Sequence, residues 1–218
     1  MKKCLFLLLL CFVTFAGVFA QASVKGGITL ATMNEESENI SRDDIERHSI
    51  TGPVLGLAFD MQLSSLFTIQ PELLYSQSGG RNSYSFLGST IESTYRINYL
   101  EVPILAKIEL GNSDSHKGGL GVYAAAGPWV GFALNGKSKV TSPLGTVEQD
   151  FTFDDEDDAK RLNYGFAAGA GINAGKLTLD LRYNFGVNNL LDNDADNSND
   201  NKPVRQTRGL ALTLGYNF

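Results

Sequence analysis

The sequence predicts an all-β fold, namely an eight-stranded antiparallel up-and-down transmembrane β-barrel with short periplasmic turns and long extracellular loops. Three observations predict it. The first residues have the composition of a secretory signal peptide, eight later segments have the alternation or composition of β-strands, and long and short links between them strictly alternate. A barrel with both termini in the periplasm requires such links, because its strands are joined by turns on one side and by loops on the other.

The N-terminus predicts the compartment. A basic Met-Lys-Lys start is followed by an almost wholly apolar run, and Val18-Phe19-Ala20 has the small-x-small pattern of a cleavage site. We therefore expect residues 1–20 to be a secretory signal peptide and residues 21–218 to be one outer-membrane β-barrel domain. The expected location is the cell outer membrane.

Two alternatives for the N-terminus stay open. A retained membrane helix would need a longer apolar run than this one. A lipoprotein would use Cys11, which follows Leu10 rather than a small residue. Both cysteines, Cys4 and Cys11, lie in the segment that cleavage removes. The mature chain would then have no disulfide and would depend on packing and backbone pairing.

The net charge argues against a nucleic-acid partner. The full chain has a formal net charge of −6, and cleavage would remove two lysines and make it still more acidic. Binding to nucleic acid needs a basic face.

Eight segments are expected to be strands, and no long stretch has the helical spacing of apolar residues. Most are near the ~9–11 residues that a tilted strand needs to cross a bilayer. They are Val24–Thr32, Val54–Leu63, Phe67–Gln77, Ile97–Leu110, Leu120–Leu134, Tyr164–Asn173, Leu177–Phe185 and Arg208–Phe218.

The links between these segments alternate in length. The short links are Ser64–Ser65, Gly111–Gly119 and Ala174–Lys176, and the long ones are Met33–Pro53, Ser78–Arg96, Asn135–Asn163 and Gly186–Thr207. The sequence therefore predicts short turns in the periplasm and long loops outside the cell.

The last segment has one apolar face, formed by Leu210, Leu212, Leu214, Tyr216 and Phe218. Such a face suits lipid, with aromatic residues at the interface. The strand must pair with both the preceding strand and the first one, because an open edge in lipid leaves backbone groups unsatisfied. Phe218 also resembles the terminal aromatic residue that the barrel-assembly machinery recognises. That machinery and outer-membrane lipid are therefore the expected partners, together with an extracellular or envelope protein.

Charged residues fall on the inner phase of the third, fourth and seventh segments. They are Glu72, Glu101, Lys107, Glu109, Asp180 and Arg182. They could form a proton path, a pore lining or a catalytic pair, but an eight-stranded barrel is just wide enough for side chains to fill. We expect a salt-bridged plug in which at least one acid pairs with Arg182, because a buried charge must be paired.

The sequence does not assign the inward face of one strand, and it places prolines inside two others. Residues 121–129 are too uniformly small and apolar for their inward phase to be assigned. Pro71 and Pro103 lie inside strands, where each removes a backbone donor, so we expect a bulge or a locally broken hydrogen bond at each.

The candidate metal and catalytic residues point to no site. His48 and His116 are expected at opposite ends of the barrel, which excludes a site that uses both. Acidic runs at residues 154–158 and 192–200 carry oxygen ligands suited to Ca²⁺, but the second run fails the EF-hand spacing. Solvated loops explain both runs, and we expect no cofactor, no metal site and no catalytic residue.

Four motifs resemble a known family. They are Pro71-Glu72-Leu73-Leu74-Tyr75-Ser76-Gln77-Ser78-Gly79, Tyr99-Leu100-Glu101-Val102-Pro103-Ile104, Ala126-Gly127-Pro128 and Arg182-Tyr183-Asn184-Phe185-Gly186. They resemble the PorT-like outer-membrane β-barrel proteins of Bacteroidota, over essentially the whole mature chain. The resemblance implies an eight-stranded barrel in the outer membrane and no single activity. The family's namesake is tied to protein secretion and gliding.

The expected function is that of a non-enzymatic outer-membrane barrel with a structural or surface-interaction role through its loops. A narrow porin-like channel, a secretion- or gliding-associated factor and an outer-membrane enzyme are the alternatives. A soluble calyx for an apolar ligand is disfavoured, because its apolar face would point inward, where this sequence places charges.

Overall fold

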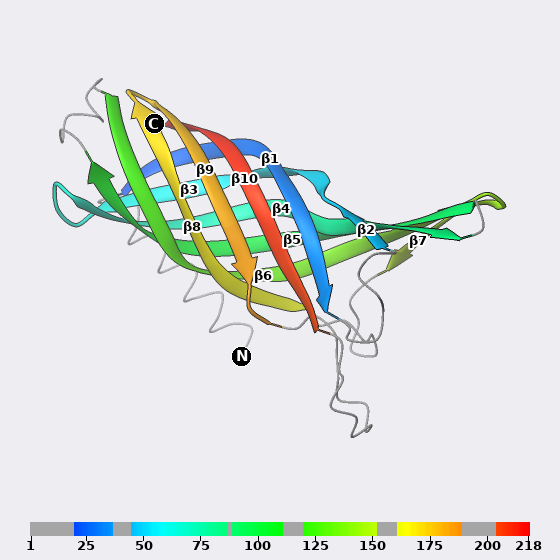
Figure 1. Cartoon of the computed structure of the whole chain (residues 1–218). Coiled ribbons are helices and arrows are strands. Elements are labelled where there is room, and N and C mark those ends of the chain that lie inside the picture. Colours follow the sequence, from blue (N-terminus) through cyan, green and yellow to red (C-terminus); the bar gives the residue numbers. More distant parts are fainter. Residues whose placement is uncertain (1–19, 37–44, 87–88, 111–119, 152–160, 189–203) are drawn as a thin grey trace, which may run out of the picture.

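The computed structural model describes residues 20–36, 45–86, 89–110, 120–151, 161–188 and 204–218. These residues form one antiparallel sheet of ten strands (Figure 1). The strands are β1 (Ala20–Glu36), β2 (Ile45–His48), β3 (Ile50–Gln62), β4 (Phe67–Phe86), β5 (Ser89–Leu110), β6 (Leu120–Ser142), β7 (Gly145–Phe151), β8 (Leu162–Ala174), β9 (Leu177–Gly186) and β10 (Val204–Asn217).

Eight of these strands close into a barrel. Around the ring the order is β1, β3, β4, β5, β6, β8, β9 and β10, and every neighbour along the chain is also a neighbour in space. Strand β10 closes the ring, because it pairs with β9 on one side and with β1 on the other. The predicted up-and-down topology and the double pairing of the last strand are confirmed.

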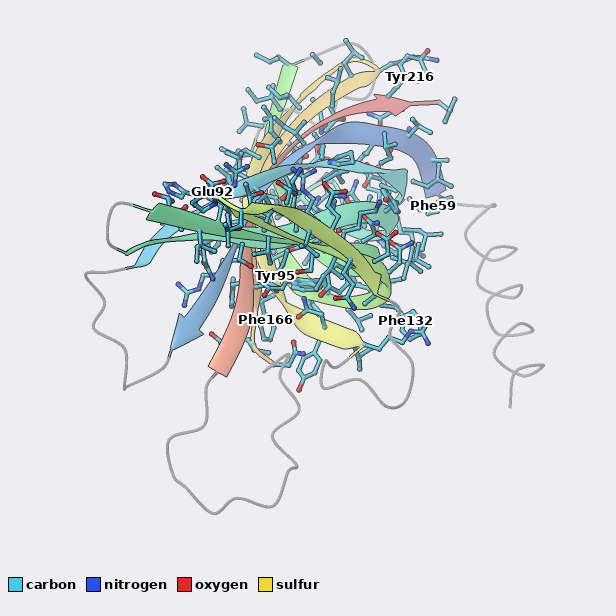
Figure 2. All side chains as sticks on the ribbon, turned by 90° about the vertical axis from the view of Figure 1, so that its right-hand side faces the viewer. Phe59, Glu92, Tyr95, Phe132, Phe166 and Tyr216 are labelled. Atoms are coloured by element: carbon cyan, nitrogen blue, oxygen red, sulfur yellow. The ribbon has the colours of Figure 1, made fainter. Side chains whose placement is uncertain are left out.

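Side chains along the barrel strands alternate between an apolar outward face and a polar inward face. On β9, Leu177, Leu179, Leu181 and Tyr183 are exposed, while Thr178, Asp180 and Arg182 are buried. The outward aromatic residues Phe132, Phe166 and Tyr216 are labelled in Figure 2. We call this outward surface the apolar belt. Its exposed aliphatic and aromatic side chains are what a lipid-facing surface requires.

The segment whose phase the sequence left open is part of β6. Its large side chains Tyr123 and Trp129 point inward and are buried, whereas Val122 and Val130 point outward. The hydrophobicity pattern does not reveal this alternation, because alanines and glycines occupy both faces of the segment.

The prolines interrupt the sheet ladder as expected. Between β4 and β5 the paired positions stop at Pro71 with Ile104 and resume at Leu74 with Glu101, and the register is the same on both sides. Between β5 and β6 they stop likewise after Pro103 with Trp129. The prediction of locally broken hydrogen bonding is therefore confirmed, without a bulge at either proline.

Three barrel strands continue far beyond the ring. The outer parts of β4, β5 and β6 carry β2 on one edge and β7 on the other, in the order β2, β4, β5, β6, β7 (Figure 1). We call this sheet of residues 45–48, 79–86, 89–97, 136–142 and 145–151 the extension. The register of β5 with β6 shifts by one residue between Asn98 and Tyr99, where the extension begins.

Three of the four links that were expected to be long loops contain strands of the extension. Residues Ser78–Arg96 and Asn135–Asn163 were expected to be loops, yet most of their described residues are strand, and β2 lies within Met33–Pro53. The physical reason is that the extension stands outside the belt and carries polar residues on both faces. Its strands therefore lack the apolar-and-polar alternation that identifies a strand half buried in a core or in lipid.

The opposite end of the barrel holds the tight turns and both ends of the described chain. The backbone N–H of Phe218 donates to the carbonyl of Ala22, and that of Asn217 donates to the carbonyl of Lys176 in the β8–β9 turn. Gly175 in this turn has a φ of 60°, which favours glycine. Among the described residues no helix has the length and apolarity to cross a membrane. The expected signal peptide, apart from Ala20, and the turn at residues 111–119 lie outside the described residues.

We expect a charge in the middle of the belt to destabilise the barrel. Leu181 lies halfway along β9 and half exposed on the outward face, so Leu181→Arg should cost about 2–4 kcal/mol of unfolding free energy in lipid. Val147 is also exposed but lies on the extension, so Val147→Arg should change stability by less than about 0.5 kcal/mol. Urea titration in liposomes measures both values. Equal effects of the two variants would contradict the placement of the belt.

Candidate functional site

The centre of the barrel interior is occupied by Glu72 of β4. The guanidinium of Arg182 donates to both of its oxygens, from Nη1 to Oε2 at 2.6 Å and from Nη2 to Oε1 at 3.0 Å. The Nζ of Lys25 donates to Oε1 at 2.7 Å. All three residues are buried. A two-pronged guanidinium contact of this kind is among the strongest hydrogen-bonding arrangements available to a carboxylate.

Asp180 joins this cluster from β9. Its Oδ1 lies 3.3 Å from Nη2 of Arg182, and its Oδ2 lies 3.9 Å from Nζ of Lys25. The hydroxyl of Tyr123 donates to the same Oδ2 at 2.7 Å. Gly171 is the cross-strand partner of Tyr123, and any side chain there would collide with the phenol ring. The glycine therefore allows Tyr123 to reach across the lumen to the acid.

A second ion pair lies nearer the end of the barrel that holds the tight turns. The Nζ of Lys107 is 3.2 Å from Oδ2 of Asp60, and Gln70 donates to Oδ1 of Asp60 at 2.6 Å. Lys107 also lies over the ring of Tyr123, with its Nζ 4.3 Å from the ring centroid. The oxygen of Gln70 accepts from Lys25 at 3.4 Å, which joins the two clusters. We call these seven residues together the lumen network: Lys25, Asp60, Gln70, Glu72, Lys107, Asp180 and Arg182.

The lumen between this network and the extension is polar but less charged. The hydroxyl of Ser76 donates to Glu101, and the Nδ2 of Asn163 donates to Thr207 at 2.9 Å. A space of about 40 Å³ is lined by residues of both the network and this region, including Glu101 and Trp129. It is large enough for a few water molecules.

The network fills the centre of the lumen with paired charges. Each cation of the network contacts at least one carboxylate, and the residues come from β1, β3, β4, β5 and β9. Breaking one partner of a buried ion pair costs several kcal/mol, because the other charge is left uncompensated. The network therefore ties five of the eight barrel strands to one another through the interior.

All six predicted inward charges lie inside the barrel. Glu72, Glu101, Lys107, Glu109, Asp180 and Arg182 are buried. Arg182 pairs with two acids, so the predicted pairing is confirmed. Sequence reasoning missed Lys25, Asp60 and Tyr123. Lys25 alternates with outward Val24 on β1, a signal that the neighbouring glycines at 26 and 27 obscure.

The other candidate residues do not join this site. His48 ends β2 and is exposed on the extension, away from the lumen. His116 and the acidic runs at 154–158 and 192–200 lie outside the described residues. Within the described ranges no group of three or more histidine, cysteine or acidic residues is placed to hold a metal ion.

A family model of the outer membrane protein beta-barrel domain matches residues 18–192, which is most of the chain. The chain belongs to this family. It is therefore an integral outer-membrane β-barrel protein. The apolar belt faces lipid, the short turns lie on the periplasmic side, and the extension stands on the extracellular side. No curated protein sequence matches the chain.

Solved outer-membrane proteins are similar to the chain at low sequence identity. OprG of Pseudomonas aeruginosa is 11% identical, with 92% of this chain and 96% of that chain covered and a TM-score of 0.48. Ail, the attachment invasion locus protein of Yersinia pestis, is 12% identical, with 92% and 100% covered and a TM-score of 0.40. Neisserial surface protein A is 10% identical, with 90% and 97% covered and a TM-score of 0.41.

Removing the acid at the centre of the network should destabilise the barrel strongly. Glu72→Ala leaves Arg182 and Lys25 with Asp180 alone, so we expect a loss of about 3–5 kcal/mol in urea unfolding. The matched control Glu148→Ala breaks an exposed, solvent-screened pair with Lys139 and should leave the unfolding free energy nearly unchanged.

A double variant distinguishes the ion pair from simple packing. Glu72→Leu with Arg182→Leu leaves Lys25 beside Asp180 and should cost less than Glu72→Ala alone. A double variant that costs at least the sum of the single variants would contradict the assignment of Glu72 as the charge partner of Arg182.

Proposed function

We propose that this protein is a non-enzymatic outer-membrane anchor that presents the extension for contact with an extracellular or envelope protein. The single observation that carries this proposal is the extension itself. Three of the eight barrel strands continue as a paired sheet well beyond the belt (Figure 1). An ordered sheet at this position is a rigid interaction surface, whereas connecting loops tend to be mobile.

The lumen-side face and the tip of the extension are suited to a protein partner. Ile91, Val140 and Val147 point to the lumen side and are exposed, and Leu144 at the β6–β7 turn is fully exposed. Figure 2 views the molecule with the extension toward the reader and labels Tyr95 and Glu92 on it. Apolar side chains gathered on an exposed surface outside the membrane are typical of an interaction site.

The edges of the extension support the same proposal. In the part of the chain that the structure describes, β2 pairs with β4 alone and β7 pairs with β6 alone. A strand at a sheet edge presents backbone donors and acceptors to which another chain can add a strand. Strand β7 offers the longer of the two edges.

The proposal of a non-enzymatic role rests on the lumen network. The buried acids Glu72, Asp180 and Asp60 each contact a lysine or arginine. Charges that hold one another in place contribute to a plug, whereas an enzyme needs an acid or base that faces a substrate.

We also propose that this chain belongs to the PorT-like branch of the family, which is found in Bacteroidota. The motifs that carry it include Glu72, Glu101 and Arg182, which all lie in the lumen. A shared motif that supplies the interior charges has a structural reason to recur among barrels of this type.

We further propose that the barrel-assembly machinery recognises β10. The rings of Tyr216 and Phe218 lie edge to face, with centroids 5.7 Å apart, on the outward side of this strand. They form an aromatic feature at the periplasmic end of the strand that closes the barrel.

The interaction proposal predicts protein crosslinks from the extension in intact cells. A photoreactive amino acid at Val147 should give a discrete adduct with another protein, because this side chain is exposed outside the membrane. The same amino acid at Leu181 should give no such adduct, because lipid covers the belt. Lack of a discrete adduct from Val140, Leu144 and Val147 alike would contradict the proposal.

The assembly proposal predicts a defect in cells that is absent in vitro. Phe218→Ala should lower the amount of barrel inserted in cells, while the purified variant still refolds in detergent and keeps the heat-dependent gel shift. Loss of one exposed ring costs only about 1–3 kcal/mol. Phe166→Ala, which removes another outward ring from β8, serves as the control and should insert normally. Equal insertion of the two variants, or a failure of Phe218→Ala to refold, would refute the assignment.

A further inference from the structure

The outward face of the extension differs from its lumen-side face. It carries charged side chains in cross-strand rows. Arg96 of β5 lies opposite Lys137 of β6, and the next row outward includes Arg81 of β4 and Lys139 of β6. We call these four residues the basic cluster. A surface hollow of about 470 Å³ is lined by all four, together with Glu92 and Glu148 among others.

The basic cluster is continuous with the apolar belt. Along β5, Leu100, Asn98 and Arg96 follow one another on the outward face, and Lys137 follows Leu134 on β6. A strand rises ~3.3 Å per residue, so the backbone of Arg96 lies only about 13 Å from that of Leu100 along β5. A long arginine or lysine side chain at this height reaches back to the interface where lipid headgroups lie.

The row of the extension nearest the belt carries two cations, Arg96 and Lys137, and one acid, Asp150 of β7, which lies opposite Lys137. Arg208 is the first charged outward residue on β10, and Arg161 stands directly before β8. The guanidinium of Arg161 lies 4.6 Å from the ring centroid of Phe132, an outward residue of β6. Basic residues thus stand at the extracellular margin of the belt on several strands, and they are densest at Arg96 and Lys137.

The pairing of Arg96 with Lys137 is unfavourable by itself. Like charges directly opposite each other on one face of a sheet are destabilising. Lys137 has Asp150 at 3.3 Å, Lys139 has Glu148 at 2.9 Å, and Arg81 has Glu92 at 4.0 Å. Among the described residues no carboxylate lies within salt-bridge distance of Arg96. An anion between Arg96 and Lys137 would remove the repulsion.

We propose that Arg96 and Lys137, with Arg81 and Lys139 beside them, bind a phosphate group of an anionic lipid headgroup in the outer leaflet. The planar guanidinium of Arg96 suits a two-pronged contact with phosphate, and Lys137 adds a second point charge. The belt directly below accommodates the acyl chains of the same lipid. This continuity with the lipid-facing surface selects a lipid rather than a dissolved phosphate. The proposal rests on the outer-membrane location and is independent of the proposed protein partner.

The test uses the full-length protein in nanodiscs of neutral phospholipid doped with a phosphorylated outer-membrane glycolipid or with its dephosphorylated form. Lipid retention is measured by native mass spectrometry. Wild type should retain the phosphorylated lipid preferentially. Arg96→Gln with Lys137→Gln should lower the affinity by about fivefold for each charge removed. The control Lys176→Gln removes an exposed cation at the periplasmic end and should leave retention unchanged.

A stability measurement keeps the proposal testable if retention is hard to quantify. Arg96→Gln relieves the repulsion with Lys137, so it should raise the unfolding temperature in neutral detergent. In nanodiscs with the phosphorylated lipid the same variant should lower it, because a ligand contact is lost. This reversal of sign is not expected from a merely structural role of Arg96.

Four results would overturn the proposal. These are equal retention by the double variant and wild type, equal retention of the phosphorylated and dephosphorylated lipids, and the same sign of the Arg96→Gln effect in both environments. The fourth is displacement of the lipid by millimolar inorganic phosphate, which would assign the cluster to a dissolved anion instead.

Discussion

Closure of the backbone ladder between β1 and β10 is the constraint on which the structure depends. In lipid each unpaired backbone N–H or C=O costs several kcal/mol, so a sheet with a free edge cannot stay in the membrane. The fourteen paired positions that run from Ser23 with Asn217 to Glu36 with Val204 remove that edge. The extension obeys the same rule, because a sheet outside lipid can have an open edge. Its sheet opens only outside the membrane, where, among the described residues, β2 and β7 each have one unpaired edge that water or a partner can satisfy.

Closure with eight strands also decides what the interior contains. The lumen is so narrow that side chains from opposite walls meet, as Glu72 of β4 meets Lys25 of β1 and Arg182 of β9. The carboxylate of Glu72 needs cationic partners in this space, and its two partners come from two different strands. The paired charges at the centre of the lumen therefore have a structural explanation in the geometry of the barrel. Side chains on the outer surface have no such constraint.

The sequence allowed the barrel and much of its interior to be predicted, because lipid and lumen impose opposite polarity on alternate residues. Asp180 and Arg182 alternate with Leu179, Leu181 and Tyr183 and could be placed inside with no further information. Tyr123 could not, because alanines occupy both faces around it and the pattern has no contrast. The extension was missed for a related reason. Arg96, Thr94 and Glu92 on one face and Tyr95 and Ser93 on the other are all polar or amphipathic, so nothing in their spacing distinguishes strand from loop.

Along β5 the difference in polarity between the outward and the lumen face disappears toward the extension. The outward phase changes from Leu100 to Arg96 within four residues, and the lumen phase changes from Tyr99 to Ser93 over a similar length. One strand therefore passes from lipid through the headgroup region into water, and each face meets a different environment on the way. The outward face meets phosphate-bearing headgroups first, which favours arginine and lysine there. The lumen face meets the space above the barrel mouth, which favours side chains that a protein partner can cover. The two proposed contacts, one with lipid and one with protein, follow from a single strand that extends past the edge of the membrane.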